Sequence, residues 1–329
     1  MQFALAWTYA VLMGSCIWQW TKAVVRMRRG EPLLAYQPRQ RSRWDLVDLL
    51  ITIVFYFTAL GTAQLVLRQF IDATELESFD DLPLRERAKV FFATACGSVA
   101  WCLLSIGMLR LRRGVTLRDL GISLRELGSD MALGLKAFAM IGPPVYVIQF
   151  TLIQYFPTEH PLIVMLQQDP HPLFFLVSAF AAVLVAPFAE EYLFRGLLQG
   201  WLENIAAGLP AVHGAPVNGT DDGEPAVAGA SEPSSHFAPR HDAEKEIELG
   251  DARSPGIRGP AWPILVSALV FALMHWSHGP DPIPLFFFAV GLGFLYRQTH
   301  RLMPCIVVHL LLNGLTLLSM YVSVVYGNA

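Results

Sequence analysis

Two adjacent glutamates are the residues of this chain best suited to chemistry. They follow a long apolar run, from Phe174 to Phe188, as Glu190 and Glu191. An ionisable side chain inside a membrane helix is costly, so it usually faces the interior of the helix bundle and serves a function. A carboxylate in an apolar cleft also holds a proton more readily than it does in water, which suits a general base or acid.

The two glutamates are expected to have different surroundings. On a helix, Glu191 and Arg195 are four residues apart, in the favourable order for an ion pair. Glu190 points about 100° away from Glu191, at 3.6 residues per turn. We therefore expect Arg195 to neutralise Glu191 and Glu190 to face the bundle interior. The other interpretation is that all three residues only mark the interfacial end of a membrane span.

Two of the nine histidines lie within predicted helices. His275 shares a helix face with Phe271, and His309 shares one with Asn313, because each pair is four residues apart. Either motif alone is typical of packing or of interhelical hydrogen bonding, worth about 0.6 kcal/mol per contact. Together with the glutamates, these polar intrusions into apolar segments favour a hydrolytic site.

Two hydrolytic chemistries fit these residues. In the first, Glu190 and His275 hold and deprotonate a water, while His309 and Asn313 donate hydrogen bonds to the oxyanion of the tetrahedral intermediate. In the second, Glu190, His275 and His309 bind a divalent metal such as zinc, which acidifies the water. The sequence contains no H-E-x-x-H motif and does not separate the two chemistries.

The elements that position these residues are predicted to be membrane helices. The chain has 329 residues, of which 54% are hydrophobic and 16% charged, with a mean hydropathy of +0.44. A soluble domain usually carries about 25% charged residues. We therefore predict an all-α, polytopic integral membrane protein with the lipid bilayer as its surroundings. No basic stripe with interleaved aromatic residues indicates nucleic-acid binding.

Eight apolar segments are candidates to cross about 30 Å of hydrocarbon. The sixth and seventh are short and flank a Gly-Pro-Asp-Pro turn, which favours a tight hairpin. We expect the last five to form a conical cluster around a water-accessible site. The eight segments are 3–21, 45–67, 88–109, 131–156, 173–196, 262–277, 283–298 and 302–325.

The charges of the loops predict the orientation. The first, third, fifth and seventh loops carry Lys and Arg. The second loop is mostly acidic, and the fourth and sixth loops contain no Lys or Arg. By the positive-inside rule, the basic loops lie in the cytoplasm and both termini lie outside, as in a bacterial-type plasma membrane.

The apolar pattern divides the chain into four parts. Residues 1–110 hold three spans, 111–205 contain the glutamate motif, and 260–329 contain both histidine motifs. Residues 206–259 are rich in Gly, Pro, Ala, Ser, Asp and Glu, a composition typical of disorder. We interpret this segment as a disordered cytoplasmic insertion, and a partner-binding role for it stays open.

Three motifs in order on successive spans resemble the CPBP family, also called the Abi family. They are Glu190-Glu191-x-x-x-Arg195, Phe271-x-x-x-His275 and His309-x-x-x-Asn313. This family comprises the CAAX proteases and the bacteriocin-processing enzymes. The resemblance covers roughly residues 116–321, and the Asp119-Leu120-Gly121 stretch also looks like the family's lead-in to its core.

The resemblance implies an intramembrane endopeptidase, a hydrolase acting on a protein or peptide substrate in the membrane. It implies that Glu190 is the catalytic glutamate, that His275 activates the water, and that His309 and Asn313 stabilise the oxyanion. Glu191 and Arg195 would then support the site. Members are also described as metalloproteases. We favour the chemistry without a metal, because Glu190 and His275 suffice to activate a water.

Two other functions remain as alternatives. A proton-coupled transporter could use Glu190 and the histidines as a relay, but the chain shows no internal repeat. A non-catalytic membrane scaffold or immunity protein could recruit partners through the insertion. The depth of His275 is also open: if its helix starts at Ala261, His275 lies about 20 Å along it, far from the expected depth of Glu190.

Overall fold

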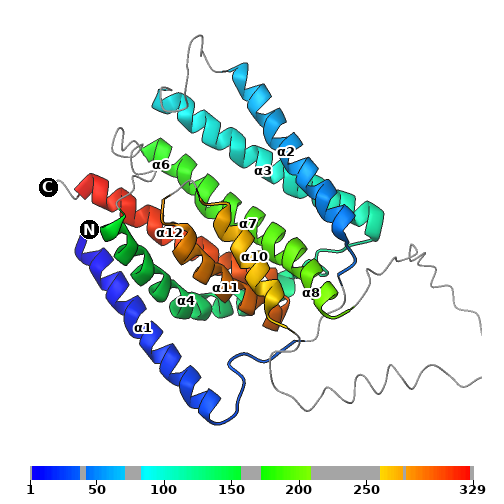
Figure 1. Ribbon diagram of the computed structural model, residues 1–329. Helices are drawn as coiled ribbons and strands as arrows, with labels where there is room; N and C mark the ends of the chain where they lie inside the picture. Colours follow the sequence, from blue (N-terminus) through cyan, green and yellow to red (C-terminus); the bar gives the residue numbers. More distant parts are fainter. Residues whose placement is uncertain are drawn as a thin grey trace, which may run out of the picture.

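The chain folds into a bundle of helices. The computed structural model describes residues 2–37, 42–70, 83–156, 172–208, 260–276 and 279–326, and these ranges contain helices and no strand. Eight helical rods run through the molecule (Figure 1). They are α1 (Gln2–Arg28), α2 (Leu46–Arg68), α3 (Leu84–Arg113), α4 (Leu127–Tyr155), the continuous rod α6–α8 (Pro172–Ala206), α10 (Trp262–Leu273), α11 (Pro282–Thr299) and α12 (Leu302–Tyr326).

The prediction of an all-α polytopic membrane protein is confirmed. Each of the eight predicted segments coincides with one rod, and five rods are long and apolar enough to cross a membrane: α2, α3, α4, α6–α8 and α12. The apolar α10 has 12 residues. It therefore extends about 18 Å, short of the roughly 30 Å of a hydrocarbon core. The sequence predicts eight spans, and the described residues form eight rods. By length and composition alone, five of these rods can cross a membrane.

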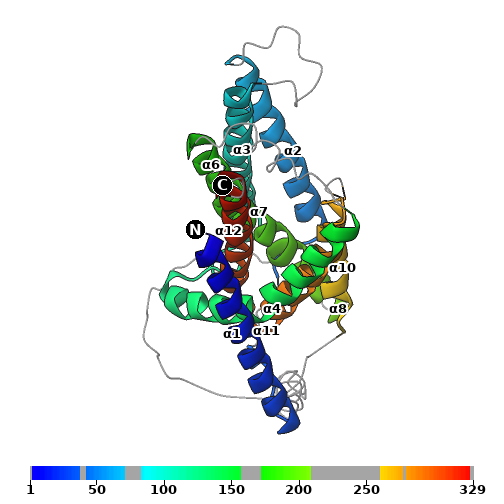
Figure 2. The same ribbon diagram turned by 90° about the vertical axis from the view of Figure 1, so that its left-hand side faces the viewer.

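α12 lies at the centre of the bundle. It packs against α4, α11, α1 and the α6–α8 rod. α1 lies on one flank of the molecule, and α2 and α3 form a pair on the opposite flank (Figures 1 and 2). α10 and α11 pack against each other on either side of the predicted hairpin turn. The α6–α8 rod and α12 therefore meet in the interior, where the glutamate motif and the last histidine motif face each other.

The rod α6–α8 changes its winding on both sides of the glutamates. Residues Phe180–Val185 (η3) and Tyr192–Gln199 (η4) are π-helical, and the α-helical turn α7 (Ala186–Glu191) lies between them. Pro187 begins α7. Proline has no N–H to donate and its ring clashes with the preceding turn, so an ordinary α-helix cannot run through it undisturbed. π-helical turns are rare and frequently occur at functional sites.

A short turn before α4 fixes the start of α12. The Asp119 carboxylate accepts hydrogen bonds from the backbone N–H and the hydroxyl of Thr116, both at 2.8 Å. The N–H of Leu302 donates to the carbonyl of Gly121 at 2.8 Å. Gly121 has φ +76°, and a Cβ added there would lie 2.5 Å from the carbonyl oxygen of His300. This close approach needs glycine.

An ion-pair cluster at the same corner ties the turn to α4. The Arg301 guanidinium lies 2.6 Å from a carboxylate oxygen of Asp130 and 3.0 Å from one of Glu126. Asp130 is fully buried. A buried carboxylate needs such a partner. The corner between α11 and α12 is thus held by backbone and charge, and it sets the register of the helix that carries His309 and Asn313.

The predicted disordered insertion lies outside the described residues, apart from residues 206–208. In these residues α8 ends at Ala206, followed by a turn. Residue 278, at the start of the predicted hairpin turn, is also outside them.

Replacement of Gly121 by alanine is predicted to destabilise the fold. The substitution Gly121→Ala combines an unfavourable φ with a clash against the backbone of His300, so we expect a loss of more than about 1 kcal/mol. Gly107→Ala is the matched control, because a Cβ at Gly107, inside α3, meets nothing within 4 Å. The thermal unfolding midpoint in nanodiscs measures both, and equal midpoints would contradict the role of this corner.

Candidate active site

One buried carboxylate joins three elements at the centre of the bundle. The Oε1 atom of Glu191, at the end of α7, accepts a hydrogen bond from Nη1 of Arg195 at 3.0 Å and lies 2.8 Å from Nδ1 of His309 on α12. The three side chains are 0%, 1% and 3% exposed. The ion pair that the i,i+4 spacing predicts is therefore present. The contact with His309 was not predicted, because 118 residues separate the partners.

Glu190 has different surroundings from its neighbour. Its side chain is 30% exposed, and its Oε2 atom lies 3.8 Å from Nε2 of His309. That oxygen is buried and has no hydrogen-bond partner in the part of the chain that the structure describes. A buried acceptor without a partner costs free energy unless water or a ligand satisfies it. Glu190 is therefore the carboxylate of the pair that is placed to bind a water or a substrate.

The contacts of His309 orient its ring. An ionised carboxylate only accepts hydrogen bonds, so Nδ1 of His309 carries the proton that points to Glu191. Nε2 then faces Oε2 of Glu190. The ring of Phe288 packs edge-on against this imidazole, with centroids 5.2 Å apart. The ring is thus fixed by hydrogen bonding on one side and by packing on another.

His275 lies just after a helix and not inside one, so the predicted helix 262–277 was too long. α10 ends at Leu273, and His275 stands in the turn that follows. The carbonyl of Phe271 belongs to the last turn of α10, where carbonyls lack intrahelical partners. Nδ1 of His275 lies 2.9 Å from that carbonyl oxygen. Because the carbonyl only accepts, Nδ1 donates, and Nε2 is the acceptor nitrogen of a neutral ring.

Three site residues pack against the ring of Phe271. Phe271 is fully buried. Its ring centroid lies 4.9 Å from that of His275 and 5.9 Å from that of His309. The guanidinium carbon of Arg195 lies 4.7 Å from the same centroid, in a cation–π contact. His275 is therefore close to the other motifs, although Glu190 and His275 do not hydrogen-bond to each other directly.

Asn313 donates a hydrogen bond to a backbone carbonyl that receives no N–H from its own π-helical segment. In segment η3 the N–H of Ala186 donates to Ala181, five residues back. The same register would give the carbonyl of Ala182 the N–H of residue 187, but Pro187 has none. The side-chain amide of Asn313 donates to this carbonyl at 2.8 Å instead. One N–H of the amide group remains for another acceptor, since the group has two.

Pro187 is the sequence signal that could have located this acceptor. A proline within an apolar run always leaves one carbonyl of the preceding turn without its backbone donor. The three motifs do not include this carbonyl, so Ala182 is absent from the predicted set of site residues. The packing of Phe288 on His309 had no comparable signal, because a phenylalanine in an apolar helix predicts only burial.

The described residues do not form a ready metal site. No group of three or more His, Cys, Asp or Glu side chains in the described ranges lies close enough together to hold a metal ion. The zinc alternative, with Glu190, His275 and His309 as ligands, stays a prediction.

Comparison with known protein families agrees with the motifs. Apolar helices around a buried cluster of carboxylates, imidazoles and a guanidinium define an integral membrane protein with a polar interior site. The model of the Rce1-like type II CAAX prenyl endopeptidase family matches residues 172–217 and 248–315, which include all three motifs. Over these two stretches the chain is similar to the CAAX protease family, in agreement with the resemblance that the motifs indicated. No curated protein and no solved structure matches it.

Removal of each of the two glutamates is predicted to affect stability differently. Glu191→Ala leaves the Arg195 guanidinium buried without its partner, which typically costs about 3–5 kcal/mol. Glu190→Ala removes a carboxylate that has no hydrogen bond, so we expect an unchanged or higher unfolding midpoint. Thermal unfolding of both variants in nanodiscs checks this. A larger loss for Glu190→Ala than for Glu191→Ala would overturn the assignment of the structural carboxylate.

Proposed function

We propose that this protein is an intramembrane endopeptidase that hydrolyses a peptide bond in a membrane-associated protein, with prenylated or similarly lipidated peptides as the substrate class. The observation that carries the proposal is Glu190, whose buried oxygen has no hydrogen bond and lies 3.8 Å from His309. This unsatisfied carboxylate lies within the region that matches the CAAX protease family.

In the proposed reaction, Glu190 and His275 activate a water. Glu190 has an oxygen open to a donor, and the neutral His275 ring has Nε2 as its acceptor atom, because Nδ1 is committed to Phe271. A water held by both groups loses a proton to Glu190 as its oxygen attacks the scissile carbonyl carbon. When the carbon–nitrogen bond breaks, that proton passes to the leaving amine, so Glu190 returns to its starting state.

His309 and Asn313 are proposed to stabilise the oxyanion that forms on the carbonyl. With protons on both ring nitrogens, His309 donates from Nδ1 to Glu191 and from Nε2 to the oxyanion. Asn313 donates its second amide N–H, because the first is bound to Ala182. Both donors are fixed before the substrate arrives, which makes such stabilisation effective.

Glu191 and Arg195 are proposed to position the site without touching the substrate. Glu191 holds the proton of His309 on Nδ1, and Arg195 balances the charge of Glu191. Both side chains are buried. The apolar helices around them exclude bulk water, which strengthens the electrostatic interactions inside.

Loss of the water-activating pair is predicted to abolish cleavage. Glu190→Gln keeps the shape of the side chain and removes its basicity, so kcat should fall by about 10²–10⁴-fold, the usual contribution of a general base. His275→Ala should have a similar effect. Glu31→Gln, on the half-exposed Glu31 after α1, is the control. Cleavage of a farnesylated peptide and of the same peptide without the lipid is measured in nanodiscs.

The outcomes of this assay separate the chemistry from the substrate class. Full activity of Glu190→Gln would refute the mechanism. Equal cleavage of both peptides would refute the lipidated class and leave the endopeptidase. Activity that is lost with a chelator and restored by zinc would favour the metal alternative. In cells, membrane and secreted peptides that differ between wild type and Glu190→Ala at equal abundance would identify the natural substrate.

The oxyanion assignment predicts a separate kinetic signature for Asn313. Asn313→Ala removes one donor, so kcat should fall by about 10²–10³-fold while KM changes little, since the oxyanion exists only along the reaction path. Ser319→Ala, further along α12, is the control. A variant that changes KM and leaves kcat intact would place Asn313 in substrate binding instead.

A further inference from the structure

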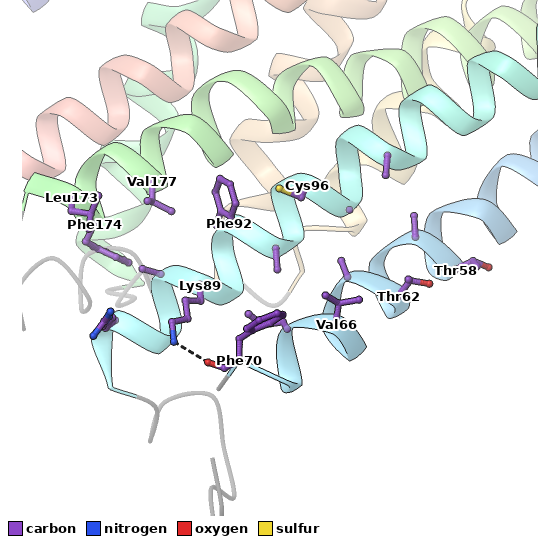
Figure 3. Close-up of a pocket in the computed structure, with 18 of the residues that line it drawn as sticks. Thr58, Thr62, Val66, Phe70, Lys89, Phe92, Cys96, Leu173, Phe174 and Val177 are labelled. Atoms are coloured by element: carbon purple, nitrogen blue, oxygen red, sulfur yellow. Dashed lines mark hydrogen bonds between the residues drawn. The ribbon is translucent and has the colours of Figure 1, made fainter. Parts of the chain in front are cut away.

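A large cavity lies on the flank of the molecule away from the candidate active site. Its volume is about 1010 Å³, and it lies open to one side between the second half of α2, the first two-thirds of α3 and the start of α6 (Figure 3). Ligand pockets usually measure about 300–1,000 Å³. All but three of its lining residues lie outside the region matched by the CAAX family model. The cavity is therefore a feature of this chain's own N-terminal helices.

Small residues are the reason for the cavity. α2 and α3 come close at Gly97, where an added Cβ would lie 3.1–3.3 Å from atoms of Leu60, Ala63 and Ala59. Further along, Ala93 and Ala100 face the same space. Larger aromatic residues, Phe70, Phe92 and Phe174, line the cavity on the side where α2 ends (Figure 3). A space bounded in this way is wide and apolar.

The lining offers few polar partners to an occupant. The Thr58 hydroxyl donates to the carbonyl of Val54 within its own helix. The Lys89 ammonium is bound to both carboxylate oxygens of Glu86 and to the carbonyl of Phe70, each at 2.9 Å. A peptide segment would bring backbone N–H and C=O groups that need partners in an apolar phase. A hydrocarbon chain needs none, so the lining favours a lipid tail over a peptide.

The length of the cavity matches one leaflet of a bilayer. From Thr58 to Phe70 it follows α2 over about 18 Å at 1.5 Å per residue. Half of the hydrocarbon core is about 15 Å thick. The charged lining residues, Arg85 and Lys89, both lie near the start of α3, at the same end as Phe70 and Leu173. The cavity thus has one polar end and one apolar end, as a lipid does.

Arg85, at the polar end of the cavity, indicates the charge of the lipid headgroup. Arg85 is exposed and has no hydrogen bond or ion pair among the described residues, whereas Lys89 beside it is neutralised by Glu86. A guanidinium binds a phosphate with two parallel hydrogen bonds. Within the described ranges no carboxylate balances the charge of Arg85, which favours a lipid with net negative charge over a zwitterionic one.

We propose that this cavity is a binding site for an anionic phospholipid, which places one acyl chain between α2, α3 and α6 and its phosphate against Arg85. The buried aromatic pair Trp101 and Tyr192, with ring centroids 5.6 Å apart, joins α3 to the glutamate rod and does not line the cavity. The lipid is thus a ligand separate from the substrate, and it fills the space that the small residues leave.

Photocrosslinking in nanodiscs tests this site. The full-length protein is reconstituted with phosphatidylglycerol that carries a diazirine in one acyl chain, or with the matching phosphatidylcholine, and adducts are mapped by mass spectrometry. We expect adducts on cavity residues such as Phe92 and Cys96, severalfold more with phosphatidylglycerol. An adduct density no higher than on the exposed face of α1, or equal labelling by both lipids, would overturn the proposal.

Two variants and their controls sharpen the test. Ala93→Trp fills the cavity and should remove the adducts, whereas Leu103→Trp on the exposed surface of α3 should not. Arg85→Gln should abolish the preference for phosphatidylglycerol, and Arg28→Gln, which removes the same charge from α1, should keep it. If Ala93→Trp unfolds, Arg85→Gln still decides, because its side chain is exposed. Displacement of the lipid by a farnesylated peptide would overturn the proposal by identifying the cavity as a substrate site.

Discussion

The Glu191 carboxylate is the contact on which the interior of this bundle depends. It is fully buried, and it binds Arg195 four residues further along the same rod and His309 on a different helix. A charge buried without partners would cost several kcal/mol, so the two helices can pack closely only in the register that brings all three groups together. This single constraint sets the position of α12 against the rod and, with it, the distance between Glu190 and Nε2 of His309.

The same register explains why the surrounding elements have unusual geometry. Pro187 and the two π-helical segments widen the rod around the glutamates, and Asn313 takes up the carbonyl that this winding leaves open. At the other end, the glycine turn and Arg301 hold the first residues of α12. These contacts restrain α12 against the rod and at its first residues. Its second half is held by hydrogen bonds from Tyr146 to Leu312 and Thr316 and by one between Tyr9 and Ser319.

Much of the fold could be predicted from the sequence, because membrane helices depend on local hydropathy. The eight rods were located in this way, and the Glu191–Arg195 pair follows from spacing within one helix. The contact between Glu191 and His309 could not be predicted, since it depends on how two rods pack. The end of α10 was misplaced because Met274 and Trp276 continue the apolar pattern, although the helix stops at Leu273. Only the broken helix brings the Nδ1 atom of His275 to the Phe271 carbonyl.

The double attachment between the α6–α8 rod and α12 has a consequence for motion. One link joins Glu191 to His309 and the other joins Ala182 to Asn313, so the two helices are held at two points along their length. Separating them would break both polar contacts inside an apolar phase. These helices should therefore move as one rigid unit, and any opening that admits a polypeptide has to occur at a seam with fewer polar contacts.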